Sequence, residues 1–145
     1  LADYYGREGI EARDTLELLY LSMKALSKEI IPNRLIRCIY ELKTLVLNGE
    51  YPNVFECGMC GSKDNLDYFD LNHNSVLCRQ CHGSIKQDKL LEASTIYALQ
   101  YIITSPINKL YTFQVKENVL EQMENIIGEY IKKVVDKKFN SLDFI

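Results

Sequence analysis

Apolar residues recur every three or four positions in the first third of the chain, which is the spacing of one face of an α-helix. Asp14 and Glu17 have the spacing of a capping box at the start of a first helix. Its apolar stripe comprises Leu16, Leu19, Tyr20, Met23, Leu26 and Ile30. Pro32 suits the first turn of a second helix, and Gly49 suits its end. The apolar positions of that helix are Leu35, Ile36, Ile39, Leu42, Leu45 and Val46. We expect the two helices to pack as an antiparallel pair.

The spacing changes in the middle of the chain. A short strand is predicted from the apolar residues Leu66, Tyr68, Phe69 and Leu71. Turn formers occupy residues 72–75, and Val76 with Leu77 can return as a second strand. The pattern therefore predicts a β-hairpin between the helical parts.

Helical spacing returns after the hairpin. Ser94 can cap a helix that ends before Pro106, and a short helical turn is predicted over residues 106–111. The last helix has a broad apolar stripe formed by Val119, Leu120, Met123, Ile126, Ile127, Tyr130, Ile131, Val134 and Val135. Its glutamates come early and its lysines, at positions 132–138, come late, as the helix dipole favours. We interpret those lysines as a solvated helix end.

Five cysteines add a specific chemistry to this frame. Cys57 and Cys60 form one CxxC pair, Cys78 and Cys81 form a second, and 17 residues separate the pairs. Two such pairs at this separation are typical of a zinc site, because both sulfurs of a pair can reach one ion and four thiolates complete a tetrahedron. Gly61 and Gly83 follow the pairs, where the chain must turn tightly. The sequence therefore predicts one structural Zn²⁺ in a zinc-ribbon hairpin.

Other interpretations of the cysteines fit less well. The odd number of cysteines and the absence of a secretory signal disfavour disulfides, and the flanks lack the βαβ setting of a redox CxxC. Catalytic zinc keeps an open coordination position, which four thiolates do not leave. His73 lies in the predicted turn and His82 follows Cys81, so we expect neither to be a ligand. Cys38 is predicted to be a small buried apolar residue.

The size and composition fit one globular domain. With 145 residues, nearly half of them apolar, we expect a mainly α fold with a single helical domain over 1–145 and a four-cysteine zinc-ribbon module inserted at 53–86. No run of about 18 apolar residues could span a bilayer, and no signal peptide pattern begins the chain, so we expect a cytoplasmic location without membrane contact. Leu1 in place of methionine leads us to expect further sequence upstream.

Charge is distributed unevenly. The net charge is −3, so the chain is a poor general polyanion binder and any contact with nucleic acid must be local. Between Leu18 and Leu47, however, positive charges exceed negative ones. The basic residues there are Lys24, Lys28, Arg34, Arg37 and Lys43. The first four flank the connection between two helices, which predicts an anion or partner site; an ordinary charged helix surface is the alternative.

Several of these features together resemble a known family. Four segments, in this order along the chain, are similar to the C-terminal domain of the bacterial recombination mediator RecO. They are Tyr40–Lys43, the motif at 49–52 (Gly-Glu-Tyr-Pro), the two CxxC pairs, and the terminus at 138–145 (Lys-Phe-Asn-Ser-Leu-Asp-Phe-Ile). Members of that family usually place glycine in the ribbon turn, where this chain has Asn74 and Ser75.

The resemblance implies a function and partners. RecO proteins help to place RecA on single-stranded DNA coated with single-strand-binding protein, act with RecR and anneal complementary strands. They are recruited by the acidic, Phe-ended tail of single-strand-binding protein, for which Arg34 and Arg37 beside Leu35, Ile36 and Tyr40 are the candidate site. Their main DNA-binding part is an N-terminal OB-fold, a five-stranded barrel absent from this sequence. The family implies a nucleoid-associated protein that is not an enzyme.

The alternative function is an unrelated zinc-ribbon interaction module, for instance in transcription or translation. Enzymatic activity is disfavoured, because neither histidine lies in a nucleophile or carboxylate motif and no Gly-rich phosphate loop is present.

Overall fold

The computed structural model describes residues 2–83 and 89–142, with the side chains of 12–83 and 89–137. The chain forms two compact units, the first from Leu1–Tyr51 and Ile102–Val115 and the second from Pro52–Tyr101 and Lys116–Ile145. The expected mainly helical fold with a small zinc-ribbon-like hairpin is confirmed. None of the described helices is both long and apolar enough to cross a bilayer.

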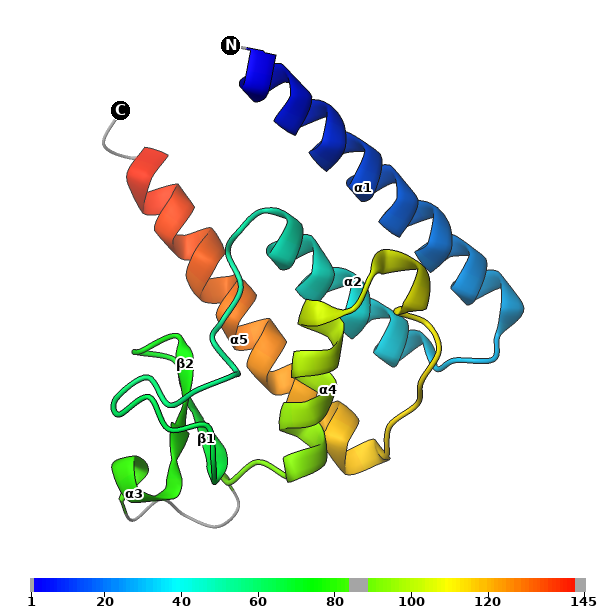
Figure 1. The fold of residues 1–145 in the computed structure, drawn as a ribbon. Helices are drawn as coiled ribbons and strands as arrows, with labels where there is room; N and C mark the ends of the chain where they lie inside the picture. Colours follow the sequence, from blue (N-terminus) through cyan, green and yellow to red (C-terminus); the bar gives the residue numbers. More distant parts are fainter. Residues whose placement is uncertain (1, 84–88, 143–145) are drawn as a thin grey trace. The chain divides into compact units, whose positions relative to one another are not determined.

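The first unit is built on a helix pair. Helix α1 (Ala2–Lys28) and helix α2 (Asn33–Leu47) lie side by side, and the short connection between them reverses the chain (Figure 1). The expected antiparallel pair is thus confirmed. Side chains buried in this unit include Leu18, Leu35, Ile39, Leu42, Ile102 and Leu110. A short 3-10 helix, η2 (Ile107–Lys109), contacts α1 and confirms the helical turn expected after Pro106.

Two expectations about α1 are wrong. The helix begins at Ala2 and continues through Asp14, so Asp14 and Glu17 do not form a capping box at its start. Among residues 12–28 the buried positions are Leu18, Ser22 and Ala25, whereas the side chains of the predicted apolar stripe are 41% to 70% exposed. Ser22 fits this face because its hydroxyl donates to the Leu18 carbonyl at 2.7 Å and contacts the hydroxyl of Tyr111. The helix is therefore apolar on two faces, and α2 and η2 do not cover the predicted stripe.

The ends of α2 follow from its flanking residues. Pro32 is the residue before the first helical position, and its carbonyl accepts the backbone N–H groups of Leu35 and Ile36 at 3.0 and 3.1 Å. At the other end Gly49 has φ +71°, a left-handed conformation that glycine adopts without strain. Glycine at this position lets the chain leave the helix where the sequence predicted its end.

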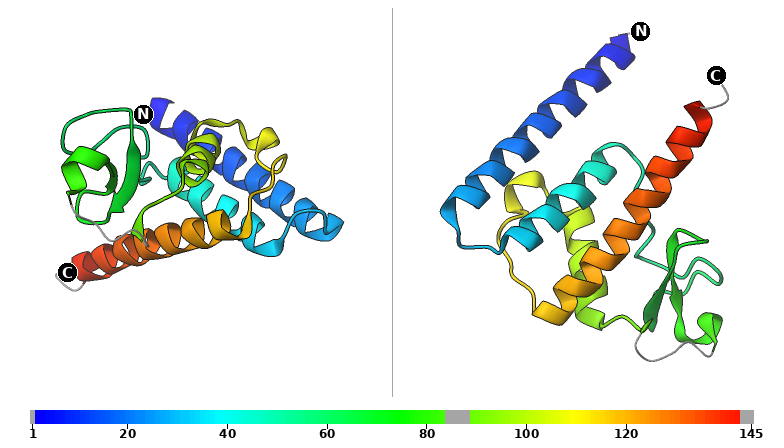
Figure 2. Two further views of the ribbon diagram at one scale, coloured as in Figure 1. Left: turned by 90° about the horizontal axis from the view of Figure 1, so that it is seen from below. Right: turned by 180° about the vertical axis from the view of Figure 1, so that it is seen from behind.

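The second unit contains the hairpin and two further helices. Strand β1 (Leu66–Asp70) pairs antiparallel with β2 (Ser75–Cys78), and one helical turn, α3 (Arg79–His82), follows β2. Helix α5 (Glu117–Leu142) lies beside the hairpin in both views (Figure 2). Helix α4 (Ala93–Thr104) starts in this unit and ends in the first. Ser94 lies within α4 rather than capping it, so that detail of the prediction is wrong.

The apolar stripe of α5 agrees with the sequence over its first part. Its buried residues are Val119, Leu120, Met123, Ile126, Ile127 and Tyr130. Further along, Val134 is half-buried and Val135 is exposed. The side chains of Lys138 and of the predicted terminal motif lie outside the described residues, as do residues 84–86 of the predicted module.

The hairpin turn contains an asparagine in a left-handed conformation. Asn74 has φ +54°, in the left-handed region, and asparagine tolerates that region better than other non-glycine residues. The backbone N–H groups of His73 and Asn74 donate to the carbonyls of Asp70 and Leu71. Asn74 thus supplies the conformation that the turn requires.

Candidate metal centre

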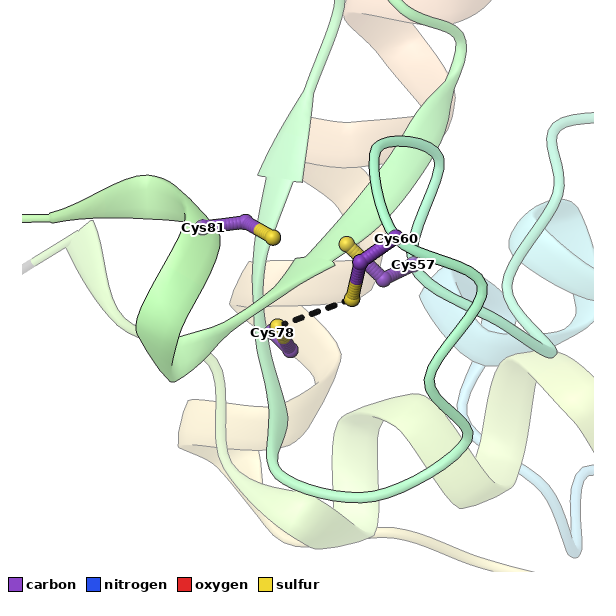
Figure 3. Close-up of side chains that lie close together, drawn as sticks. All are labelled: Cys57, Cys60, Cys78 and Cys81. Atoms are coloured by element: carbon purple, nitrogen blue, oxygen red, sulfur yellow. Dashed lines mark hydrogen bonds between the residues drawn. The ribbon is translucent and has the colours of Figure 1, made fainter.

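The four cysteines of the two CxxC pairs converge on one point. Their sulfur atoms all lie within 4.8 Å of one another, although they come from a loop before β1, from the end of β2 and from α3 (Figure 3). The Sγ atoms of Cys60 and Cys78 are 3.6 Å apart, far beyond the roughly 2.05 Å of a disulfide bond. All five cysteines are free thiols, and Cys38, buried in α2 as expected, lies outside the cluster.

A tight loop shapes the first pair. The backbone N–H of Cys57 donates to Ser62 O at 2.7 Å, and Gly61 N–H donates back to Cys57 O at 2.9 Å. Gly61 has φ +78°, which confirms the predicted need for glycine after the pair. Within the loop, the Met59 N–H points at Cys57 Sγ from 3.4 Å, a donor that favours the thiolate form. The loop therefore turns both sulfurs inward and stabilises negative charge on one of them.

Gly58 has a role that the spacing of cysteines does not reveal. A Cβ atom at this position would lie 2.0 Å from the hydroxyl oxygen of Ser75, which is buried in β2. The Gly58 N–H also donates to Val76 O at 3.0 Å, so the first loop runs against β2. Only glycine allows this close approach between the loop and the strand. No pattern in a single sequence could have identified it.

The second pair is held by an acidic residue of β1. Cys78 ends β2, Cys81 lies in α3, and Gly83 leaves the helix with φ +67°, as predicted. Asp67 accepts from His82 Nε2 at 2.6 Å and from Arg79 Nε at 3.3 Å. The His82 side chain is 4% exposed and its ring lies 5.8 Å from that of Tyr68. His82 therefore fixes α3 on the hairpin instead of binding metal.

The electrostatics of the four sulfurs favour a shared cation. Burial acts to raise the pKa of Cys57, but backbone N–H groups, that of Cys78 first, outweigh it and bring the pKa to about 6. The pKa of Cys60 is raised above its usual value. The Ser62 backbone acts to lower this pKa, but the neighbouring sulfurs of Cys78 and Cys57 act to raise it. The sulfurs of Cys78, Cys60 and Cys57 raise the pKa of Cys81. One thiolate thus forms easily, and a positive ion among the sulfurs would favour the loss of further protons.

The geometry fits a tetrahedral metal ion with four thiolate ligands. Sulfurs about 2.3 Å from a shared tetrahedral ion lie roughly 3.8 Å from one another, close to the 3.6 Å between Cys60 and Cys78. Among the described residues, neither histidine joins the cluster, as expected: His73 is exposed and contacts Asp70, and His82 contacts Asp67. The four cysteines could therefore hold one metal ion and leave no ligand position for water.

Polar contacts attach the hairpin to the helices of the same unit. Lys133 of α5 donates to Leu71 O at 2.5 Å and to the Asn74 side chain at 2.8 Å. Gln100 of α4 donates to Val54 O at 2.8 Å. The expectation that residues 132–138 form a simple solvated helix end is therefore wrong for Lys133, which binds the hairpin turn.

The structure exposes four of the five basic residues of the predicted partner site and buries Lys43. Lys24 and Lys28 are exposed near the end of α1, and Arg34 and Arg37 are exposed on the first turns of α2. Arg37 forms an ion pair with Glu41 at 2.8 Å. Leu35 and Ile36 are only 1% and 2% exposed, so they cannot line a surface groove as expected. The apolar part of the predicted peptide site is therefore wrong.

Lys43 is not part of any surface cluster. It is 6% exposed, and its ammonium group donates to the carbonyls of Ile102, Ile103 and Ser105 at 3.2, 3.2 and 2.7 Å. These carbonyls lie at the end of α4, where a helix leaves acceptors without intrahelical donors and a positive charge is favoured. Burial lowers the pKa of Lys43, and the charge of Asp14 acts in the opposite direction. Lys43 caps α4 and is not available to bind an external anion.

A groove does exist on the first unit, on the side of Lys24 and Lys28. It has a volume of about 390 Å³ and lies between the end of α1 and the segment 107–114. Its apolar lining includes Leu21, Ala25, Ile31, Ile107, Tyr111 and Phe113. Lys24 and Lys28 also line it, so it combines an apolar floor with two ammonium groups.

Comparison with known proteins identifies relatives over nearly the whole chain. The family described as "Recombination protein O C terminal" matches residues 1–143. DNA repair protein RecO of Acetivibrio thermocellus is 31% identical over 141 residues, covering 95% of this chain and 55% of that protein. DNA repair protein RecO of Thermoanaerobacter sp. is 30% identical over 140 residues, covering 94% and 56%. The chain spans about half the length of the curated relatives it matches.

Proposed function

The chain belongs to the RecO C-terminal domain family, and from that premise we propose that it is the non-catalytic partner-binding part of a recombination mediator in DNA repair. The observation that carries the proposal is the family match over residues 1–143, with four clustered cysteines at the predicted positions. The alternative of an unrelated zinc-ribbon module does not hold for a chain matched over this length. By analogy with its relatives, the chain would assist RecA loading and strand annealing together with RecR.

The metal in this proposal is zinc in a structural role. Four thiolates favour Zn²⁺ over cations that prefer oxygen ligands, and a closed set of four is typical of structural sites. Residues 53–86 then act as a module inserted into a single helical domain, and the bound ion supplies the charge that the four sulfurs need. Zinc thereby fixes the hairpin and gives Lys133 a rigid turn to bind.

The groove beside Lys24 and Lys28 is the better candidate for the acidic, Phe-ended tail of single-strand-binding protein. A peptide with carboxylates next to a terminal aromatic ring requires cations beside an apolar recess, and this groove has both. Arg34 and Arg37 have the charge, but the apolar residues beside them are buried.

A fluorescence titration with a labelled tail peptide compares the two sites. We expect replacement of both Lys24 and Lys28 by alanine to weaken binding roughly tenfold, since exposed ionic contacts are each modest. The matched control, with Arg34→Ala and Arg37→Ala, should change the dissociation constant little. If the arginine variant binds the peptide more weakly than the lysine variant does, the site lies at the start of α2 instead. An absence of tail binding by the wild-type chain would count against the proposed partner.

We further expect this chain alone to bind single-stranded DNA weakly. Its net charge is −3, Arg37 is already paired with Glu41, and Lys133 is bound to the hairpin turn. The dissociation constant should be roughly 10 µM or higher at physiological salt. The logarithm of the association constant should fall as the logarithm of the salt concentration rises, with a slope no steeper than about −3, as expected for a handful of phosphate contacts. Tight binding that salt does not weaken, measured by anisotropy, would contradict this expectation.

A further inference from the structure

Asp67 occupies an irregular position in β1. Leu66 pairs with Cys78 and Tyr68 pairs with Leu77, so β1 contains one residue more than β2 between these two pairs. Asp67 is that extra residue, which makes the position a β-bulge. A bulge interrupts the regular alternation of a strand, redirects a side chain and is common beside functional sites. At this bulge the Asp67 carboxylate contacts α3.

One carboxylate holds both ends of α3. Oδ2 of Asp67 accepts from Nε of Arg79, the first residue of this helix, at 3.3 Å, and Oδ1 accepts from Nε2 of His82, the last, at 2.6 Å. The Asp67 side chain is only 13% exposed, and a carboxylate so well covered is stable where donors surround it. The start of α3 is also attached by its backbone, because the Arg79 N–H donates to Asn65 O at 3.0 Å. The end of the helix, next to Cys81, is held by Asp67 through His82.

The other three cysteines are attached differently. The loop that carries Cys57 and Cys60 is bonded to β2 by backbone groups, and Cys78 is itself the last residue of β2. Cys81 instead lies on a single helical turn whose residues are exposed or half-buried. In Figure 3 it extends from that turn toward the other sulfurs. The position of the Cys81 sulfur therefore depends on the contacts that hold α3.

We propose that Asp67 is a positioning residue of the metal centre: through α3 it sets how fast Cys81 detaches from a bound zinc ion, and therefore how fast zinc is released. The inference rests on the proposed structural zinc and adds which ligand opens first. Residues that orient metal ligands without touching the metal commonly change metal affinity by roughly 10- to 100-fold. With the carboxylate in place, both ends of α3 are fixed and the Cys81 sulfur stays beside the other three. Without it, the end of α3 at His82 loses its charged acceptor, and Cys81 can move away with the helix.

Exposure alone predicts a different order of release. Cys60 is the exposed cysteine of the four, whereas Cys81 is half-buried. If access to solvent decided which thiolate is lost, Cys60 would be lost first. If attachment to the fold decides, Cys81 is lost first, because side chains hold its helix while backbone groups hold the loop of Cys60. These two cysteines therefore distinguish the proposal from a site that opens at its most exposed ligand.

The rate of zinc release measures the role of Asp67. Asp67→Ala removes both contacts to α3. The matched control is Asp64→Ala, which removes an exposed carboxylate from the loop before β1 and changes the net charge equally. When zinc-loaded chains are mixed with an excess of a chromophoric chelator, release by Asp67→Ala should be roughly tenfold faster than by the wild type. Release by Asp64→Ala should be unchanged, because both contacts of Asp67 remain.

Metal content separates two kinds of failure. A wild-type chain that holds one zinc ion and releases it as fast as Asp67→Ala does would overturn this inference alone. A wild-type chain that binds no zinc would refute the structural zinc, and this inference with it. Metal analysis of the loaded chains therefore precedes the release measurement.

Alkylation identifies the cysteine that opens. The zinc-loaded chain is treated with a thiol reagent to less than one modification per molecule, and mass spectrometry locates the modified residue. In Asp67→Ala the initial rate at Cys81 should rise roughly tenfold, in step with zinc release, while the rate at Cys60 stays at the wild-type value. An equal rise at both cysteines would mean that the whole hairpin opens. Asp67 would then have only a structural role, contrary to the proposal.

Variants of His82 test the path from Asp67 to Cys81, and they also test the proposal if Asp67→Ala does not fold. His82→Ala removes the donor at the end of α3, whereas His82→Gln keeps a side-chain N–H that can reach Asp67. His82→Ala should release zinc roughly tenfold faster than the wild type, and His82→Gln should restore most of the slow release. Because the two residues form one contact, Asp67→Ala combined with His82→Ala should release zinc little faster than either alone. Effects that multiply, or a His82→Gln variant as fast as His82→Ala, would show that Asp67 does not act through His82 and would contradict the proposal.

Discussion

Replacement of Cys57 by serine is expected to abolish zinc binding and to disorder the hairpin, while α1 and α2 remain helical. The cause is the small size of the core beside the cysteine cluster: its buried members are Cys57, Leu77 and Cys78, and two of these three are themselves candidate ligands. Structural zinc contributes on the order of 10–16 kcal/mol of apparent binding free energy in small modules. That exceeds what such a core could supply, since a whole domain is stable by only about 5–15 kcal/mol.

Nuclear magnetic resonance of the labelled chain can follow this loss residue by residue. The amide signals of 57–82 should collapse toward random-coil positions in the variant, and addition of a strong chelator to the wild type should reproduce the change. Cys38→Ala is the matched control, because it removes a buried thiol outside the cluster. A Cys57→Ser variant whose hairpin signals stay dispersed would show that packing, rather than a metal ion, holds the module.

Replacement of Lys43 by methionine is expected to destabilise the chain by about 2–4 kcal/mol, because buried acceptors lose their charged donor. Methionine fills nearly the same space, so the loss comes from the carbonyls of Ile102, Ile103 and Ser105 and not from a cavity. Pro106 follows directly, and a proline has no backbone N–H that could replace the ammonium group.

Urea denaturation followed by circular dichroism measures the change as a lower midpoint at constant slope. Lys132→Met is the matched control: the same substitution at an exposed lysine of α5 should cost less than about 0.5 kcal/mol. Equal midpoints for the two variants would show that water can replace Lys43 at the end of α4.

The cysteine cluster of the candidate metal centre could be predicted from the sequence because its information is local. Two residues between the cysteines of a pair, and glycine after each pair, restrict the backbone enough to specify the four ligands. Gly58 and Asp67 could not be predicted, because their roles depend on residues distant in sequence: Ser75 for the first, His82 and Arg79 for the second.

The helices show the opposite case. Periodicity located α1, but the helix has two apolar faces, and the stronger one, with Leu16 and Met23, is exposed. Which face is buried depends on residues distant in sequence: Ser22 lies on the buried face, where its hydroxyl contacts that of Tyr111. Lys43 was predicted at the surface for a similar reason. Its charge is visible in the sequence, whereas the carbonyls that receive it lie some 60 residues further along.

The central claim is that Cys57, Cys60, Cys78 and Cys81 together hold one structural zinc ion. X-ray absorption at the zinc edge, on the chain purified without added metal, tests it most directly. The predicted result is one zinc per chain with four sulfur neighbours at about 2.3 Å and no nitrogen or oxygen bound to the metal. A spectrum that requires nitrogen or oxygen ligands would contradict it, as would a chain with an ordered hairpin and far less than one metal ion.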